Sequence, residues 1–491
     1  MPGPVPESNF RIGHAFAATP DLTGDDGPGR GIVAGFHGAG SCTDCIYLGK
    51  LAEQPFRGVW LDVRGAHAIY VMGKRRSGKS YTLGALAEGL VAQSWIRQGT
   101  DRQGVLILDT MNVYLTMPIP VAETVREDSD QQRELSRWRL GAEHIPTVLF
   151  HPIGTSLPNG LIGETISLRP SDLDAEEWCA LFEADPFVDP MGHLLTEIHG
   201  KVSTEGYPDS TTGRRVAGRP EFQLDDLRRC LDVDADLQRY PSATREALSR
   251  RLDAVGRLPV FSNQGLDVRR LLRPGQLSVL LLRDLDHNLR SVMIALIVKR
   301  MLRLRSIAEQ YERMMRVHEA RAAASQLTDP AKVATETAAA AQCREHAMMG
   351  LPRSWLIIDE AHNYIPANSA VPSRRQLKKY VDEGRNLGLS IVVATQQPSG
   401  LDGSIQRNAD VLLVHSLSHR DDIMAAEGML NTAGPEEITV DAHQRFAGPR
   451  AFEALVRSLP IGYALVSTDR ANRFFPMCVR PRITLHGGAD Y

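Results

Sequence analysis

The sequence is poor in cysteine and in lysine. Six cysteines are scattered through 491 residues, too few for the disulfide framework of a small secreted protein. Cys42 and Cys45 form a C-x-x-C pair, but no second pair or pair of histidines follows at zinc-binding spacing, which disfavours a metal site there. Only eight basic residues are lysines, against 48 arginines. A lysine in a chemically demanding position therefore carries more weight than any one arginine.

Long apolar runs and a strong net charge are also missing. No apolar run approaches the roughly 20 residues that span a bilayer. The N-terminus has neither the basic start nor the apolar stretch of a secretory signal, so we expect a cytoplasmic protein without membrane contact. The formal net charge is only -3. Contact with nucleic acid would therefore need a local basic patch or the surface of an assembly.

Eight short apolar runs recur along a chain whose length predicts two to four domains. The runs are continuously apolar rather than alternating, which is typical of strands covered on both faces of a parallel sheet. Each is five to seven residues long, too short for a buried helix, and helical patterns lie between most of them. We predict an α/β fold with a mostly parallel sheet. The runs are Ala68–Met72, Val105–Asp109, Thr147–His151, Leu277–Arg283, Trp355–Asp359, Ile391–Thr395, Val411–His415 and Ile461–Ser467.

Three regions interrupt this series. The first is rich in glycine and proline with short strand-like pieces, and the other two carry charged helical patterns that indicate insertions into the sheet. We predict a small β barrel-like domain, a core in three parts, two helical insertions and a C-terminal tail. The barrel-like domain is 1–65, the core is 66–158, 271–288 and 351–470, the insertions are 159–270 and 289–350, and the tail is 471–491.

A glycine-rich loop follows the first of the eight runs. Residues 73–80 read G-K-R-R-S-G-K-S and fit G-x-x-x-x-G-K-[ST], between an apolar strand and a helix-like run. Glycines let backbone amides surround a β-phosphate, while Lys79 offers a compact ammonium to the β- and γ-phosphates and Ser80 a hydroxyl to Mg²⁺. A turn without a ligand is the alternative. The predicted nucleotide-binding residues of this segment are Gly73, Ser77, Gly78, Lys79, Ser80 and Tyr81.

An acidic pair follows another run, in the segment W-L-I-I-D-E-A-H at 355–362. Carboxyl ends of strands are where α/β sheets bind ligands. Asp359 is predicted to hold Mg²⁺, and Glu360 to orient and deprotonate the attacking water. The alternative is that both residues simply cap a following helix.

Two further residues frame the run 391–395. Gln396 follows it, where an amide beside the acidic pair can contact the γ-phosphate. Arg385 precedes it, and we predict that this residue acts in trans as an arginine finger on a neighbouring subunit. A surface ion pair is the alternative for Arg385.

Together these segments resemble the HerA branch of the HerA/FtsK superfamily of hexameric DNA-pumping ATPases, over roughly residues 60–470. The resemblance implies an α/β ATPase core, a small N-terminal β-barrel, a helical insertion and a C-terminal tail that braces a neighbour. It also implies ATP and Mg²⁺ as cofactors and a homo-hexamer around double-stranded DNA. A separate nuclease or NAD-hydrolysing effector, in DNA end processing or anti-phage defence, is the implied partner.

The resemblance also assigns roles residue by residue. Gln396 matches the glutamine of the family's A-[ST]-Q-x-P, and Arg385 the arginine of its E-G-R-x-x-G. Asp109 matches the aspartate of its D-x-x-G-E-Y strand end and is implied to lie near the nucleotide. Here the chain departs from the pattern, because Asn112 and Val113 replace glycine and glutamate and so remove one carboxylate.

Two functions remain open. The first is an ATP-driven DNA translocase or helicase, with candidate pore segments at 112–116 and 400–407. The second is an ATP-dependent ring scaffold that activates a partner effector without translocation, which the change at Asn112 and Val113 keeps open. The chain carries no fused nuclease motif and no Leu-Ser-Gly-Gly-Gln-like segment of an ABC-type ATPase. Any cleavage of DNA would therefore need another chain.

Overall fold

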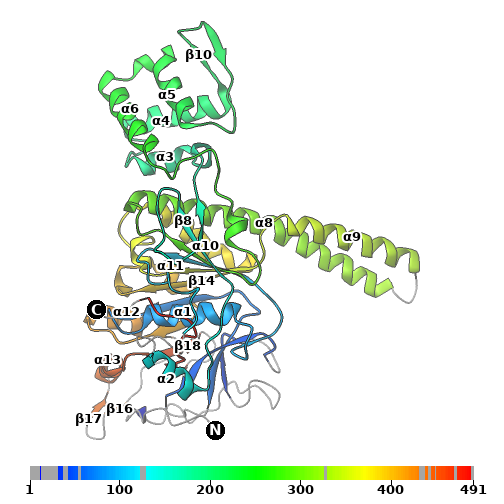
Figure 1. Cartoon of the computed structure of the whole chain (residues 1–491), viewed down its shortest axis with the longest axis vertical. Coiled ribbons are helices and arrows are strands. Elements are labelled where there is room, and N and C mark those ends of the chain that lie inside the picture. The colour runs from blue at the N-terminus through cyan, green and yellow to red at the C-terminus, as the bar shows by residue number, and fades with distance from the viewer. Residues whose placement is uncertain are drawn as a thin grey trace.

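One large sheet forms the centre of the computed structural model (Figure 1). The structure describes residues 11–12, 31–36, 42–52, 57–121, 129–325, 329–430, 437–440, 444–447, 449–468 and 473–487. Within them the sheet has 14 strands, with β6 (Arg97–Gln98) paired to β3 beside the main path. In order the others are β2 (Ile32–Ala34), β4 (Gly58–Asp62), β3 (Cys45–Leu51), β19 (Arg473–Val479), β18 (Tyr463–Thr468), β15 (Val411–Val414), β5 (Ala68–Met72), β14 (Leu389–Thr395), β13 (Ser354–Ile358), β7 (Gly104–Asp109), β12 (Leu277–Leu281), β8 (Thr147–Pro152) and β9 (Gly163–Ile166).

The eight apolar runs all form strands of this sheet, so the predicted α/β fold is confirmed. From β15 across to β9 every neighbouring pair is parallel. The eighth run, now β18, pairs antiparallel with β15. Both faces are covered: along β13, Trp355 and Ile357 join one apolar cluster, whereas Leu356 and Ile358 join the other. This double burial explains why the runs are continuously apolar.

Helices pack on both faces of the sheet. α1 contributes to the same cluster as Trp355, and α8 and α10 contribute to the cluster on the opposite face. Parallel neighbours need such crossovers, since a short turn cannot return the chain to the same edge. The helices at the core are α1 (Lys79–Val91), α2 (Ser129–Trp138), α7 (Val268–Leu271), α8 (His287–Ser325), α10 (Pro372–Glu383), α11 (Gly403–Asn408), α12 (Arg420–Met429) and α13 (Pro449–Ser458).

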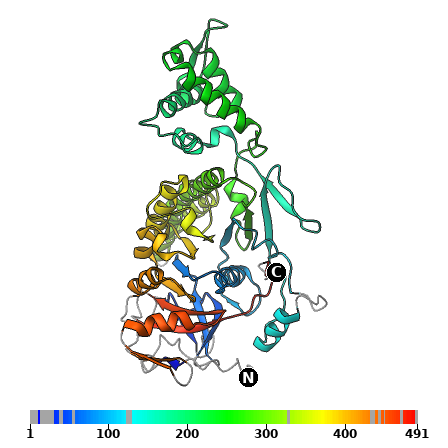
Figure 2. The ribbon, with the colours of Figure 1, turned by 90° about the vertical axis from the view of Figure 1, so that its left-hand side faces the viewer.

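The two helical insertions leave the body of the molecule. The first forms a lobe above the sheet, at the top of Figures 1 and 2, and its buried Trp178, Leu227 and Leu252 belong to the same apolar cluster as Leu356 and Ile358 of β13. Its elements are α3 (Ala175–Leu181), α4 (Pro190–Gly200), α5 (Leu224–Val233), α6 (Ser242–Gly256) and the hairpin of β10 (Tyr207–Asp209) and β11 (Arg214–Val216).

The second insertion is a helical hairpin. α8 has 39 residues, about 58 Å at about 1.5 Å per residue. Its first half is buried against the sheet, while its second half leaves the body and pairs with α9 (Pro330–Met348), as Figure 1 shows at the right.

Strands from both terminal regions of the chain join the central sheet. β3 and β4 attach to the central sheet through the antiparallel pair of β3 and β19. The barrel-like domain 1–65 stays a prediction. A second, three-stranded sheet contains β1 (Arg11–Ile12), β16 (Glu437–Val440) and β17 (Gln444–Ala447). Residues 480–487, part of the predicted C-terminal tail 471–491, pack on their own chain, where Val121 N donates to Ile483 O at 3.2 Å. Bracing of a neighbour by the tail stays a prediction. The division into domains stays a prediction.

No helix in the described parts of the chain is both long and apolar enough to cross a membrane.

Candidate functional site

The glycine-rich loop joins the end of β5 to the start of α1. Gly78 precedes α1 with a φ of 105°, a left-handed conformation that glycine adopts without strain. A Cβ on Gly73 would lie 2.5 Å from Ser77 Oγ and 2.6 Å from His415 Cβ, so only glycine fits there. The loop thus has the strand–turn–helix setting of a phosphate loop, with the N-terminal end of α1 facing it.

Lys79 and Ser80 open α1 and face the loop and the acidic pair. The Lys79 ammonium donates to the Lys74 carbonyl at 3.2 Å, inside the curve of the loop. Burial lowers the pKa of Lys79, and the carboxylates of Asp359 and Glu360 oppose that shift. Ser80 Oγ donates to Asp359 Oδ2 at 2.6 Å. Two motifs 279 residues apart therefore meet at one point.

The acidic pair lies at the carboxyl end of β13, as predicted. Asp359 Oδ1 accepts from Glu360 N at 2.9 Å. Glu360 has a φ of 50°, a strained conformation for a residue with a side chain, of a kind found most often at functional sites. Gln396, at the end of β14, donates from its amide to Glu360 Oε1.

The second oxygen of Glu360 is less tied. Oε2 is buried and makes no hydrogen bond to any described residue. It lies 3.5 Å from His362 Nδ1, which also lies 3.1 Å from Thr395 Oγ1. Burial lowers the pKa of His362, and the carboxylate of Glu360 opposes the shift. His362 ends the segment W-L-I-I-D-E-A-H, but the sequence predicted no role for it.

His415 packs against Gly73 of the phosphate loop and was not predicted as a site residue from the sequence. It follows β15, is fully buried, and its backbone N donates to Met72 O at 2.7 Å. Nδ1 lies 2.8 Å from the Tyr463 carbonyl, which can only accept, so Nδ1 carries the proton and Nε2 accepts from Thr82 Oγ1 at 3.0 Å. Burial lowers the pKa of His415 to about 4, so the ring is neutral at pH 7.

Asp109 uses its carboxylate to shape the loop that follows β7. Its oxygens accept from the backbone N–H groups of Met111, Val113 and Tyr114 at 3.0, 3.1 and 2.7 Å. Burial raises the pKa of Asp109 to about 6, and the three N–H groups oppose that rise. Its contact with a nucleotide stays a prediction.

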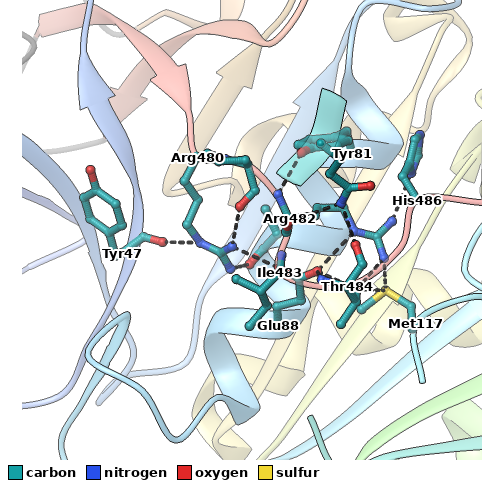
Figure 3. A network of polar contacts seen from close by, with 12 residues as sticks. Tyr47, Tyr81, Glu88, Met117, Arg480, Arg482, Ile483, Thr484 and His486 are labelled. Carbon is teal, nitrogen blue, oxygen red and sulfur yellow. Dashed lines mark hydrogen bonds and ion pairs between the residues drawn. The ribbon is translucent and has the colours of Figure 1, made fainter. Parts of the chain in front are cut away.

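Tyr81 turns toward the C-terminal segment (Figure 3). Its hydroxyl accepts from Arg482 N at 2.7 Å, and its ring meets His486 edge-on with centroids 5.2 Å apart. In the same network Glu88 of α1 binds two arginines, Arg480 at 2.9 Å and Arg482 at 3.2 Å. The predicted nucleotide contact of Tyr81 stays a prediction.

Arg385 lies apart from the other predicted site residues. It belongs to a 3-10 turn at Gly384–Leu387, before β14, whereas Gln396 follows the same strand. Seven residues separate the two ends, about 23 Å at about 3.3 Å per residue. Arg385 donates to Asn408 O at 3.2 Å and pairs with Asp410 at 3.4 Å, and about half of its side chain is exposed. It therefore cannot reach the phosphate loop of its own chain.

Both candidate pore segments are mostly buried or half-buried. In 112–116 Tyr114 is buried and the other residues are half-buried, and in 400–407 Arg407 is the exposed residue. Nothing in this arrangement selects one of them as a DNA contact.

The phosphate loop, α1 and β7 lie in a region of the chain that matches a known family. The family described as "Helicase HerA, central domain" matches residues 46–301, just over half of the chain. The chain belongs to the HerA family. It is a P-loop ATPase of the HerA type, and the resemblance seen in the sequence is confirmed.

Solved structures similar to this HerA-family chain are distant. VirB4 of Thermoanaerobacter pseudethanolicus is 15% identical with a TM-score of 0.47, over 88% of this chain and 96% of VirB4. The plasmid coupling protein TrwB is 15% identical with a TM-score of 0.44, both in complex with the GTP analogue GDPNP (86% of this chain, 87% of TrwB) and with ADP and Mg²⁺ (85% and 86%). The search of curated proteins gave no significant match.

Proposed function

We propose that this HerA-family ATPase hydrolyses ATP with Mg²⁺ and moves double-stranded DNA through a homo-hexameric ring. The observation that carries the proposal is the meeting of Ser80 and Asp359 at 2.6 Å, beside Lys79 and the pair formed by Glu360 and Gln396. This set supplies a phosphate-binding cation, hard oxygen donors and a carboxylate at one edge of the sheet. Such a set suits phosphoryl transfer, in which positioning and charge stabilisation dominate.

The donor set fits Mg²⁺. A serine hydroxyl and an aspartate carboxylate are oxygen ligands of the kind this ion takes, and it keeps several waters in sites with few protein ligands. Ser80 and Asp359 would hold the ion, which when bound would neutralise charge on the β- and γ-phosphates. Lys79 would bind those same phosphates.

Glu360 would take the proton of the attacking water. Gln396 holds Oε1, whereas the buried Oε2 has no hydrogen-bond donor among the described residues and can accept one from water. A buried acceptor without a partner is costly, and an incoming water would satisfy it. Glu360→Gln should therefore retain ATP binding and lose hydrolysis.

Arg385 would complete the site of a neighbouring subunit. Its place at the opposite end of β14, half exposed, supports action in trans. Lys79→Ala and Arg385→Ala subunits should each be inactive alone. Mixed in one ring they should regain activity, because some interfaces then pair an intact Lys79 with an intact Arg385. A mixture as inactive as its components would contradict action in trans.

The ATPase rate with and without duplex DNA tests the motor. A DNA-stimulated rate that Glu360→Gln abolishes supports translocation, and strand-displacement or triplex-displacement assays would measure it. The second candidate function is the ring scaffold for a separate nuclease or NAD-hydrolysing effector. The observation favouring it is Val113, which replaces a carboxylate and offers Asp109 only its backbone N–H. An ATPase rate that duplex DNA does not change, together with ATP-dependent activation of an added effector, would favour the scaffold function.

A further inference from the structure

The loop after β7 has a fixed shape that delivers one side chain to the acidic pair. Asp109 gathers three backbone N–H groups from residues 111–114, and Asn112 adopts a φ of 59° to allow this. Val113 takes part only through its backbone N–H. The residue that the loop turns inward is Tyr114, which is fully buried.

Tyr114 contacts the carboxylate of Asp359. Its hydroxyl donates to Asp359 Oδ2 at 3.1 Å, and the same oxygen accepts from Ser80 Oγ at 2.6 Å. The other oxygen, Oδ1, accepts from Glu360 N at 2.9 Å. Three donors from three segments therefore fix the plane of this carboxylate, and Tyr114 supplies the one that lies outside both the phosphate loop and the acidic segment 355–362.

We propose that Tyr114 is a positioning residue of the metal site, whose hydroxyl holds Asp359 facing Ser80 and so sets the affinity for the divalent cation of the nucleotide. The proposal rests on the proposed function, in which Ser80 and Asp359 hold that cation. Hydrogen-bond partners of metal-binding carboxylates orient the ligands, and removing one typically costs about 10–100-fold in metal affinity.

The position of Tyr114 also links the metal site to the C-terminal segment. Three residues along, Met117 Sδ lies 2.7 Å from Arg482 Nη2, and Thr116 Oγ1 donates to Leu485 O at 2.8 Å. The stretch 114–121 is thus held at one end by Asp359 and along its length by residues 482–485. This anchoring restricts Tyr114 to the conformation that reaches Asp359.

Tyr114→Phe removes only the hydroxyl and keeps the buried ring. Tyr70→Phe is a matched control, because Tyr70 is equally buried on β5 and its hydroxyl has no hydrogen-bond partner among the described residues. The affinity for a fluorescent ATP analogue is measured in EDTA and over a Mg²⁺ titration, and Mn²⁺ binding is followed by electron paramagnetic resonance. Thermal unfolding without metal shows whether each variant is folded.

We expect Tyr114→Phe to lower Mn²⁺ affinity about 10–100-fold while nucleotide affinity in EDTA stays within about twofold of wild type. Tyr70→Phe should match wild type in both. The proposal would be overturned if Tyr114→Phe lowered nucleotide affinity equally in EDTA and in Mg²⁺, or if it lowered neither nucleotide affinity nor Mn²⁺ affinity. If Tyr114→Phe unfolds, the Mn²⁺ titration is repeated with Asp359→Asn and with a folded double variant that carries both Tyr114→Phe and Asp359→Asn. The two should bind Mn²⁺ with equal affinity, and a lower affinity of the double variant contradicts the proposal.

Different results would contradict the proposed function and the proposed role of Tyr114. A wild-type chain whose nucleotide affinity does not respond to Mg²⁺ would contradict the metal site as a whole. A wild-type chain that responds, with a Tyr114→Phe variant that responds equally, contradicts only the role of Tyr114.

Discussion

The two ends of α1 carry two charged sites with opposite properties. At its start, Lys79 and Ser80 face a partly open site in which Glu360 keeps one oxygen without a hydrogen bond to any described residue. Two turns further along, Glu88 is fully buried and its carboxylate is saturated by Arg480, Arg482, Ile483 N and Thr484 (Figure 3). The first site has bonding capacity left for a ligand, whereas the second has none. We infer that the first serves catalysis and the second serves stability.

The largest expected effect separates the two sites by stability. Arg480→Ala would leave Glu88 short of a buried cation, and breaking a buried pair costs about 3–5 kcal/mol. Arg250→Ala is the control, because its pair with Glu246 is exposed and such changes stay within about 0.5 kcal/mol. Urea unfolding of both variants measures the difference. Equal small losses would show that the cluster around Glu88 is not a stabilising element.

Activity should separate the sites in the opposite sense. Lys79→Ala removes the ammonium that we propose binds phosphate, and the loss of one such charge-stabilising donor lowers kcat about 10²–10³-fold. The free energy of unfolding of this variant should not fall, because the loss of one hydrogen bond is offset by the removal of a buried charge that is costly to desolvate. A steady-state ATPase assay and a urea titration on the same preparation test both statements. Large destabilisation by Lys79→Ala would remove the contrast with Arg480→Ala.

His415 tests the support beneath the phosphate loop. His415→Ala deletes both ring hydrogen bonds, whereas His415→Asn retains a donor near Nδ1 for the Tyr463 carbonyl. We expect about a tenfold loss of nucleotide affinity for alanine, equal to about 1.4 kcal/mol, with a smaller loss for asparagine. Equilibrium binding of a fluorescent nucleotide gives both values. Alanine and asparagine variants that bind equally would show that the Tyr463 contact does not position the loop.

The smallest effect is a dependence on pH. Burial alone would raise the pKa of Glu88, but Arg480, Arg482 and the hydrogen bonds outweigh it and lower that pKa. A depressed pKa contributes stability that is present above the unfolded value, about 4.3, and lost as pH falls through the folded value. The stability advantage of wild type over Glu88→Gln should therefore shrink below about pH 4.3, by no more than about 1.4 kcal/mol per pH unit. A constant difference between pH 7 and pH 3 would contradict this.

The site at the start of α1 could largely be predicted from the sequence, and the cluster around Glu88 near its other end could not. Binding a phosphate and a metal ion restricts the residue types and their spacing over a few neighbouring positions. The segments G-K-R-R-S-G-K-S and W-L-I-I-D-E-A-H can therefore be recognised in the sequence. The eight apolar runs predicted eight of the 14 strands of the central sheet, whereas the antiparallel direction of β18, the strand β9 and the place of β19 lay beyond them. Glu88 gave no such signal: its partners lie 392 to 396 residues away, and any buried acid in a helix looks alike.

Tyr114 and His415 show a middle case. Tyr114 ends the D-T-M-N-V-Y segment, so its presence near the site was visible, but its bond to Asp359 depends on the loop that Asp109 folds. His415 closes an ordinary apolar strand, and only the approach of β15, α1 and β18 gives both ring nitrogens a partner.

The sequence by itself determined the α/β class, the eight central strands and the residues proposed to bind phosphate, because these depend on local patterns and on chemistry that tolerates few substitutes. Only the tertiary structure decided that the C-terminal segment clamps α1 in cis, that Tyr114 reaches Asp359, and that Arg385 lies at the far edge of the sheet. These facts depend on which distant segments meet, since burial and hydrogen-bond saturation are properties of the packed chain.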